Sequence, residues 1–178
     1  MTIVDYPRTA LGAALGARLR RVSAVVDADA TRVYAALGIA FEQRWFGVLD
    51  ALSREETLTV NALASILGVS HAAVSQTRQS LEQRGLIVSV SDPLDTRRRK
   101  LALSEGGLRL VERLTPLWKA FAEAARELDQ EAGEIARHLD QLEEALANKS
   151  LFDRIMTRVD GQVLARGSET ASTNDPPD

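Results

Sequence analysis

The segment from Asn61 to Leu81 constrains the fold most, because it contains two short helical patterns separated by only three residues. Apolar residues recur at helical spacing over 61–67 and again over 71–84. Gly68, between the two patterns, can adopt the positive φ of a tight turn, and Ala64 is small enough to lie where the helices cross. The segment predicts a helix-turn-helix, although an ordinary helical hairpin would show a similar pattern.

The second helix of this pair has an outward face suited to DNA. If Val74, Thr77 and Leu81 face the core, small and amide-bearing side chains face outward, and such side chains can enter a major groove and bond to phosphates or base edges. Glutamine on an exposed helix face is, alternatively, simply solvated. The residues predicted to contact DNA from this helix are Ser70, which also caps it, His71, Ala72, Ser75, Gln76 and Gln79.

A basic β-hairpin is predicted directly after the helix pair. Gly85 ends the helix, residues 86–91 and 99–103 have strand character, and the sequence 92–95 is typical of a turn. An arginine at such a tip can reach a neighbouring minor groove, and Asp95 can pair with an arginine and hold it extended. A charge run is otherwise usually a solvated surface. The predicted wing residues are Asp95, Arg97, Arg98, Arg99 and Lys100.

The charge distribution agrees with DNA as the partner. The whole chain carries a net charge of −3, but residues 70–104 contain six basic and three acidic residues, which gives this segment +3. A local basic surface is what matters for binding, because exposed charges are screened beyond about 8–10 Å at cellular salt.

Helices are predicted on both sides of this head. We expect helices over about 8–26 and 42–52, with a restart at Asp29, a short strand over 58–60, and a long helix over 105–130 that is kinked or broken by Pro116 near Leu114. Further helices are expected over about 131–147 and 151–159. The fold class is mainly α with a small β-hairpin wing (α+β), a winged helix-turn-helix.

The flanking helices predict a homodimer. Their apolar stripes have no further chain to cover them, and a symmetric dimer would place two recognition helices about 34 Å apart, one turn of DNA. The alternative is that the stripes pack within one chain. We expect 8–37 and 105–159 to form a helical dimerisation region, 42–104 the DNA-binding domain, and 161–178 a disordered tail.

The run from Leu58 to Gly107 resembles the MarR family of bacterial transcription regulators. The resemblance is carried by Leu63-Ala-x-x-Leu67-Gly-Val-Ser70, Leu81-Glu-x-x-Gly85-Leu-Ile87, Asp92-Pro-x-Asp95-x-Arg97 and Leu103-Ser-x-x-Gly107. It implies that Arg97 is the minor-groove arginine with Asp95 as its positioning partner, and that one helix before the head and two after it pair between subunits. Thr77 departs from the family, where the position is more apolar, so looser packing is expected there.

The resemblance also implies a small aromatic or lipophilic effector bound between the heads and the dimerisation helices. Tyr34, Phe41, Arg44 and Trp45 lie in the relevant region, although aromatic residues at helical spacing are more often core. The expected function is a DNA-binding regulator, in particular a repressor released from a pseudo-palindromic operator by such an effector.

Other classes of function are less well supported by the sequence. The chain has no cysteine, no long apolar run and no export signal, so we expect a cytoplasmic protein without membrane attachment and without cofactor. Two histidines, His71 and His138, do not make a metal site, and the adjacent carboxylates at 55–56 and 143–144 are better explained as solvated charge than as catalysts. We therefore expect no enzyme. The alternative is a winged-helix protein-interaction adaptor, which would not need a basic hairpin tip.

Overall fold

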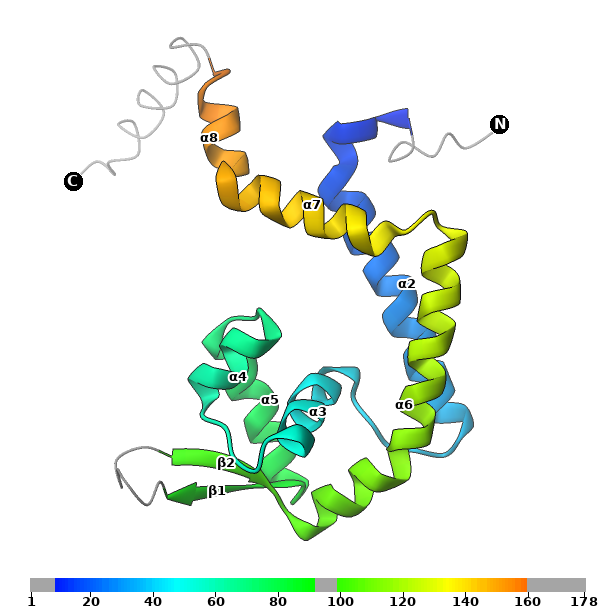
Figure 1. Cartoon of the computed structure of the whole chain (residues 1–178), viewed down its shortest axis with the longest axis vertical. Helices are drawn as coiled ribbons and strands as arrows, with labels where there is room; N and C mark the ends of the chain where they lie inside the picture. The colour runs from blue at the N-terminus through cyan, green and yellow to red at the C-terminus, as the bar shows by residue number, and fades with distance from the viewer. Residues whose placement is uncertain (1–8, 92–98, 160–178) are drawn as a thin grey trace, which may run out of the picture. The chain divides into compact units, whose positions relative to one another are not determined.

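The computed structural model describes residues 9–91 and 99–159, which form helices and one two-stranded sheet (Figure 1). Two compact units divide after Pro116. The first contains the 3-10 helices η1 (Leu11–Ala14) and η2 (Gln43–Trp45), the helices α2 (Leu15–Ala36), α3 (Phe46–Arg54), α4 (Val60–Leu67) and α5 (His71–Gln83), and the strands β1 (Ile87–Ser91) and β2 (Arg99–Leu103). The helix α6 (Glu105–Glu131) begins in this unit, and its second half belongs to the other unit with α7 (Ile135–Asn148) and α8 (Leu151–Met156). The predicted class, mainly helical with a β-hairpin, is confirmed.

The expected restart at Asp29 is wrong, because α2 runs through this region without a break. No proline or glycine interrupts the stretch from Val26 to Thr31. Local side-chain bonds support the helix instead: the Thr31 hydroxyl donates to the Asp27 carbonyl at 2.8 Å, and Arg32 pairs with Asp29 at 2.8 Å. The acidic residues taken as a helix start are therefore interior helix residues.

Of the kink or break expected at Pro116, the break is wrong, since α6 is one helix from Glu105 to Glu131, while the kink stays a prediction. Proline removes one backbone donor, which leaves a carbonyl one turn earlier without its usual partner. In the same turn, the Thr115 hydroxyl donates to the Val111 carbonyl at 2.8 Å. The helix therefore continues past the proline at the cost of one backbone bond.

The core of the first unit is built from every element of the predicted DNA-binding domain. Its completely buried side chains come from α2, η2, α3, α4, α5, the hairpin and α6, and the aliphatic ones include Leu49, Leu63, Leu81, Leu101 and Leu114. Leu and Ile at these positions bury apolar area without polar atoms, which is the dominant stabilising contribution in a small domain. Thr77, the departure from the family pattern, is buried among them at 6% exposure.

The two strands form an antiparallel hairpin, as predicted. Ile87 pairs with Leu103 and Ser91 with Arg99. Because side chains alternate between the two faces, Ile87 and Ser89 of β1 share a face with Leu101 of β2, and this face carries the buried residues. The short strand expected over 58–60 is only a single bridge between Leu58 and Leu101, since Val60 already begins α4.

In the second unit, α7 begins later than expected. Gly133 and Glu134 both have positive φ, 80° and 60°, which ends the preceding helix. The carboxylate of Asp129 then accepts from the backbone N–H of Ala136 at 2.8 Å and caps the first turn of α7. Ser150 caps α8 by accepting from the Asp153 N–H at 3.0 Å.

The expected tail at 161–178 lies outside the described residues. No helix in the described ranges is long and apolar enough to cross a membrane.

Candidate nucleic-acid interface

The turn between α4 and α5 has the geometry that its residues predict. Gly68 has φ 63° and ψ 28°, and the N–H of Val69 bonds to the Ala64 carbonyl at 3.1 Å. The hydroxyl of Ser70 accepts from the Ala73 N–H at 3.2 Å and caps α5, while Thr59 caps α4 in the same way through Ala62. Gly85 ends α5 with φ 66°. The two helices therefore form a helix-turn-helix with both N-termini capped.

The exposed face of α5 contains the residues predicted to contact DNA. Val74, Thr77 and Leu81 are buried, with exposed fractions of 1%, 6% and 0%. This orientation leaves the opposite face of the helix open. Of the predicted residues, Ser75 is half-buried and the others are exposed, namely Ser70, His71, Ala72, Gln76 and Gln79.

The hairpin brings two of the predicted wing cations to the start of β2. Arg99 is exposed and Lys100 is half-buried. The other three predicted wing residues, Asp95, Arg97 and Arg98, lie outside the described residues, and their contacts stay predictions. The hairpin itself follows α5 directly, because the Leu86 N–H bonds to the Leu81 carbonyl at 3.0 Å.

The junction of the hairpin with α6 explains the last motif of the sequence. The Ser104 hydroxyl donates to the Gly85 carbonyl at 2.6 Å and accepts from the Gly107 N–H at 3.0 Å. The Ser104 N–H bonds to the Leu86 carbonyl at 3.0 Å. Gly107 lies against that same carbonyl so closely that a Cβ would be 2.0 Å from the oxygen. The serine thus caps α6, and the glycine allows the helix to contact the strand backbone.

The aromatic residues considered for an effector site pack on one another. Tyr34, Phe41 and Trp45 are buried, with ring centroids 4.5 Å apart for Tyr34 and Phe41 and 5.6 Å apart for Phe41 and Trp45. Arg44 is exposed and pairs with Glu42 at 2.6 Å. The three rings therefore belong to the core, the alternative that the sequence left open.

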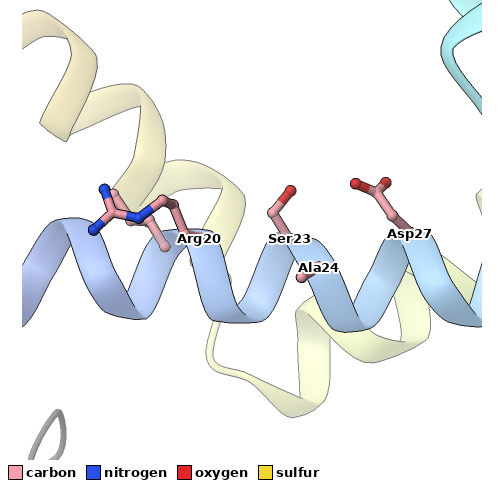
Figure 2. A pocket seen from close by; sticks show the side chains of 5 residues that line it. Arg20, Ser23, Ala24 and Asp27 are labelled. Carbon is pink, nitrogen blue, oxygen red and sulfur yellow. The ribbon is translucent and has the colours of Figure 1, made fainter.

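Two hollows on the surface of the described residues were considered as effector sites. One runs along α2 and is lined by side chains of this helix alone, so it is an open surface (Figure 2). The other, of about 530 Å³, lies between the end of α3, the end of β2 and the start of α6. Its lining residues are Leu52, Ser53, Arg54, Glu56, Leu103, Leu108, Val111 and Glu112.

Sequence reasoning missed a set of contacts that hold α5 in place. Ser80 was not singled out and Glu82 was named only as part of a family motif, yet Ser80 accepts a hydrogen bond from Trp45 and Glu82 accepts one from Ser89. Polar residues at these positions look like ordinary solvated helix residues. The partners of Ser80, Trp45 and Glu42, lie 35 and 38 residues away along the chain, and no sequence signal identifies them.

The capped helix pair, the positive-φ turn and the antiparallel hairpin packed behind it define a winged helix-turn-helix protein. Comparisons with known proteins agree. Residues 38–98 match the model of the MarR family. A helix-turn-helix (HTH)-type transcriptional regulator of Haemophilus influenzae, itself uncharacterised, is 35% identical over 68 residues, which are 38% of this chain and 21% of that protein. The chain thus spans about a fifth of the length of that relative.

Solved structures show the same fold. The S. aureus MepR–DNA complex has a TM-score of 0.62 at 22% identity and covers 74% of this chain and 97% of MepR. A mutant of E. coli MarR with operator DNA has a TM-score of 0.60 at 22% identity, with 74% and 93% covered. The Streptomyces coelicolor regulator PcaV with its natural ligand has a TM-score of 0.58 at 22% identity, with 84% and 99% covered. Residues 38–98 thus resemble the MarR family, and the solved structures share the winged helix-turn-helix fold of this chain.

Proposed function

We propose that this chain is a repressor that binds a pseudo-palindromic DNA operator as a homodimer. The exposed polar face of α5 is the observation that carries the proposal. Gln76 and Gln79 project from it, and neither side chain has a competing hydrogen bond within the described residues. The N-terminus of α5, capped by Ser70, can also hold a phosphate. Arg99 and Lys100 add positive charge beside it. The structures of MarR and MepR that share this fold contain bound DNA.

The wing is proposed to contact the flanking minor groove. Arg97, with Asp95 as its positioning partner, would enter the groove, while Arg98, Arg99 and Lys100 would meet phosphates. His71, Ala72 and Ser75 would line the major-groove side with the two glutamines. Together these contacts combine base readout from the helix with charge from the hairpin.

A selection from random-sequence DNA tests the proposal. The purified protein should enrich an inverted repeat whose half-sites lie about one helical turn apart. Binding of the enriched duplex should exceed that of a scrambled one and weaken steeply with salt, because phosphate contacts release counterions. An adaptor that does not bind DNA would enrich nothing, and this result would refute the proposal.

Two matched pairs of variants separate the roles within the interface. Gln76→Ala should change sequence preference by about 1–3 kcal/mol at one base pair, whereas Gln141→Ala on α7 should not. Arg99→Ala should weaken enriched and scrambled duplexes alike and lower the salt dependence, whereas Arg126→Ala on α6 should not. A uniform loss from Gln76→Ala would reassign this side chain to the DNA backbone.

The homodimer is proposed from the apolar surface of α2. Leu15, Leu19, Val22 and Val26 follow one another at helical spacing and are 41–60% exposed, and Ile135 and Leu139 of α7 are 48% and 38% exposed. Burial of such a stripe against a second copy would remove apolar area from water. Light scattering should give a dimer, and Val22→Glu should give a monomer with lowered operator affinity. A wild-type monomer would refute this part.

Release by a small effector completes the proposal. The hollow of about 530 Å³ has four apolar lining residues, and it falls within the size range of about 300–1,000 Å³ typical of small-molecule sites. A ligand there would touch the last residue of β2 and the first turns of α6 together. An aromatic or lipophilic ligand that raises the Tm should release the operator, and Val111→Trp, which fills the hollow, should remove the response but not DNA binding. Release that persists in Val111→Trp would exclude this hollow.

A further inference from the structure

The recognition helix α5 is held by hydrogen bonds on both of its sides. Adjacent residues of a helix are about 100° apart around its axis. Ser80 and Glu82 therefore lie on either side of Leu81, which is completely buried. Each of the two side chains bonds to a different neighbouring element.

On one side, Ser80 joins α5 to η2. The indole N–H of Trp45 donates to the Ser80 hydroxyl at 3.1 Å, and this hydroxyl donates to the Glu42 carboxylate at 3.5 Å. The guanidinium of Arg44 holds the other carboxylate oxygen, with its Nε at 2.7 Å. The hydrogen bonds run in one direction from Trp45 to Glu42, and a chain of this kind is strengthened by mutual polarisation.

Trp45 is itself fixed in the core. Only 2% of the residue is exposed, and a buried indole N–H requires an acceptor. Phe41 packs edge-on against its ring, and the guanidinium carbon of Arg84, at the C-terminal end of α5, lies 5.7 Å from the ring centroid. Trp45 therefore contacts α5 at two points, at Ser80 and at Arg84.

On the other side, Glu82 joins α5 to the hairpin. The Ser89 hydroxyl donates to Glu82 Oε1 at 2.8 Å, and Arg78 Nη1 lies 3.3 and 3.2 Å from the two carboxylate oxygens. Ser89 lies on the face of β1 that also carries buried Ile87. The carboxylate thus connects a serine of the hairpin with an arginine of the recognition helix.

We propose that Ser80 and Glu82 are positioning residues that set the rotation of α5 about its axis and thereby determine DNA sequence discrimination. This inference rests on the proposed function. Apolar packing of Val74, Thr77 and Leu81 is not directional, whereas hydrogen bonds are. A binding site must hold its side chains within about 10–20° of the productive geometry. A small rotation of α5 would misalign Gln76 and Gln79 with the base edges but leave phosphate contacts largely intact.

The test compares affinities for two duplexes at one salt concentration: the highest-affinity duplex selected from a random pool, and a scrambled one. The measured quantity is the discrimination ratio, which is the Kd for the scrambled duplex divided by the Kd for the selected duplex. Ser80→Ala and Ser89→Ala should each reduce this ratio by about tenfold, because a good bidentate base contact contributes about 1–3 kcal/mol of discrimination. Ser65→Ala is the control, since Ser65 is exposed on α4 and lies outside the proposed DNA, effector and dimer surfaces.

The ratio separates positioning from stability. A variant that only lowers the folded fraction weakens both duplexes equally and leaves the ratio unchanged. Ser80→Thr, which keeps the hydroxyl, should restore the wild-type ratio. If Ser80→Ala does not fold, Ser89→Ala carries the test from the other side of the helix.

The outcomes distinguish this inference from the proposed function. If the wild-type protein discriminates between the duplexes and both alanine variants have ratios within twofold of its ratio, the positioning role is overturned. The repressor proposal is then left intact. A wild-type ratio near one overturns the proposed function and this inference with it. A reduced ratio in both alanine variants, with Ser65→Ala and Ser80→Thr like wild type, supports the inference.

Discussion

Gly107 provides the sharpest quantitative test of the hairpin junction. An alanine Cβ at this position would lie 2.0 Å from the Leu86 carbonyl oxygen and 3.1 Å from its carbon. Ordinary contact begins near 3.4 Å, so the helix and the strand backbone would have to separate by about 1.4 Å. The neighbouring atoms are backbone and cannot rotate away, as a flexible side chain could.

The cost of Gly107→Ala follows from the bonds made by Leu86. Its carbonyl accepts from the Ser104 N–H and its own N–H donates to the Leu81 carbonyl, both at 3.0 Å. Loss of one such bond costs about 0.5–1.5 kcal/mol, and overpacking costs about 1–3 kcal/mol. Replacing glycine in a helix offsets this by about 1 kcal/mol. We expect a net loss of about 0.5–3.5 kcal/mol in the free energy of unfolding.

Urea unfolding of Gly107→Ala and Gly106→Ala, followed by tryptophan fluorescence, measures this cost. The adjacent Gly106 is the matched control, because a Cβ there would be 3.4 Å from the nearest atom. Gly106→Ala should change the free energy of unfolding by less than about 1 kcal/mol in either direction. If Gly107→Ala were as stable as Gly106→Ala, the close approach of α6 to Leu86 would be refuted.

Two further substitutions test the helix-turn-helix. Thr59→Ala removes the oxygen that accepts from the Ala62 N–H at 3.1 Å, and should lower the free energy of unfolding, measured by urea titration, by about 1 kcal/mol. Thr59→Ser keeps the hydroxyl and should be close to wild type, so equal losses from both variants would exclude the cap. Gly68→Ala forces a Cβ into a left-handed conformation that has open space around it, so the expected loss of about 1–2 kcal/mol is purely conformational. Gly68→Asn should lose less, because Asn tolerates this conformation, and a larger loss than for Ala would contradict the explanation.

The parts predicted correctly from the sequence are those governed by local chemistry. Gly68 has the positive φ expected of it, Gly85 ends α5, and Ser70 caps the same helix. Each of these features depends on residues within one turn of the chain. The pattern of buried residues on α5 was predictable for a similar reason, since helical periodicity alone decides it.

The parts that could not be predicted depend on tertiary contacts, or on residues that can either end a helix or lie within it. Trp45 is visible in the sequence as an apolar residue, but its bond to Ser80 joins residues that are distant along the chain. The continuity of α2 was missed because Asp29 was taken as a helix start, and a break in α6 was considered because proline often ends a helix. In both helices a threonine hydroxyl bonds to the carbonyl four residues earlier, a contact that the pattern does not reveal.

The bridge between Leu58 and Leu101 has a consequence for folding. The two residues exchange backbone hydrogen bonds of 3.0 and 2.8 Å, although α4, α5 and β1 separate them in the sequence. The bridge can close only after these elements have come together, so it is a contact of high sequence separation that forms late. We expect the amide protons of Leu58 and Leu101 to exchange with solvent at the same rate, by opening of the whole head, and the hairpin base to behave as part of one cooperative unit rather than as an independent appendage.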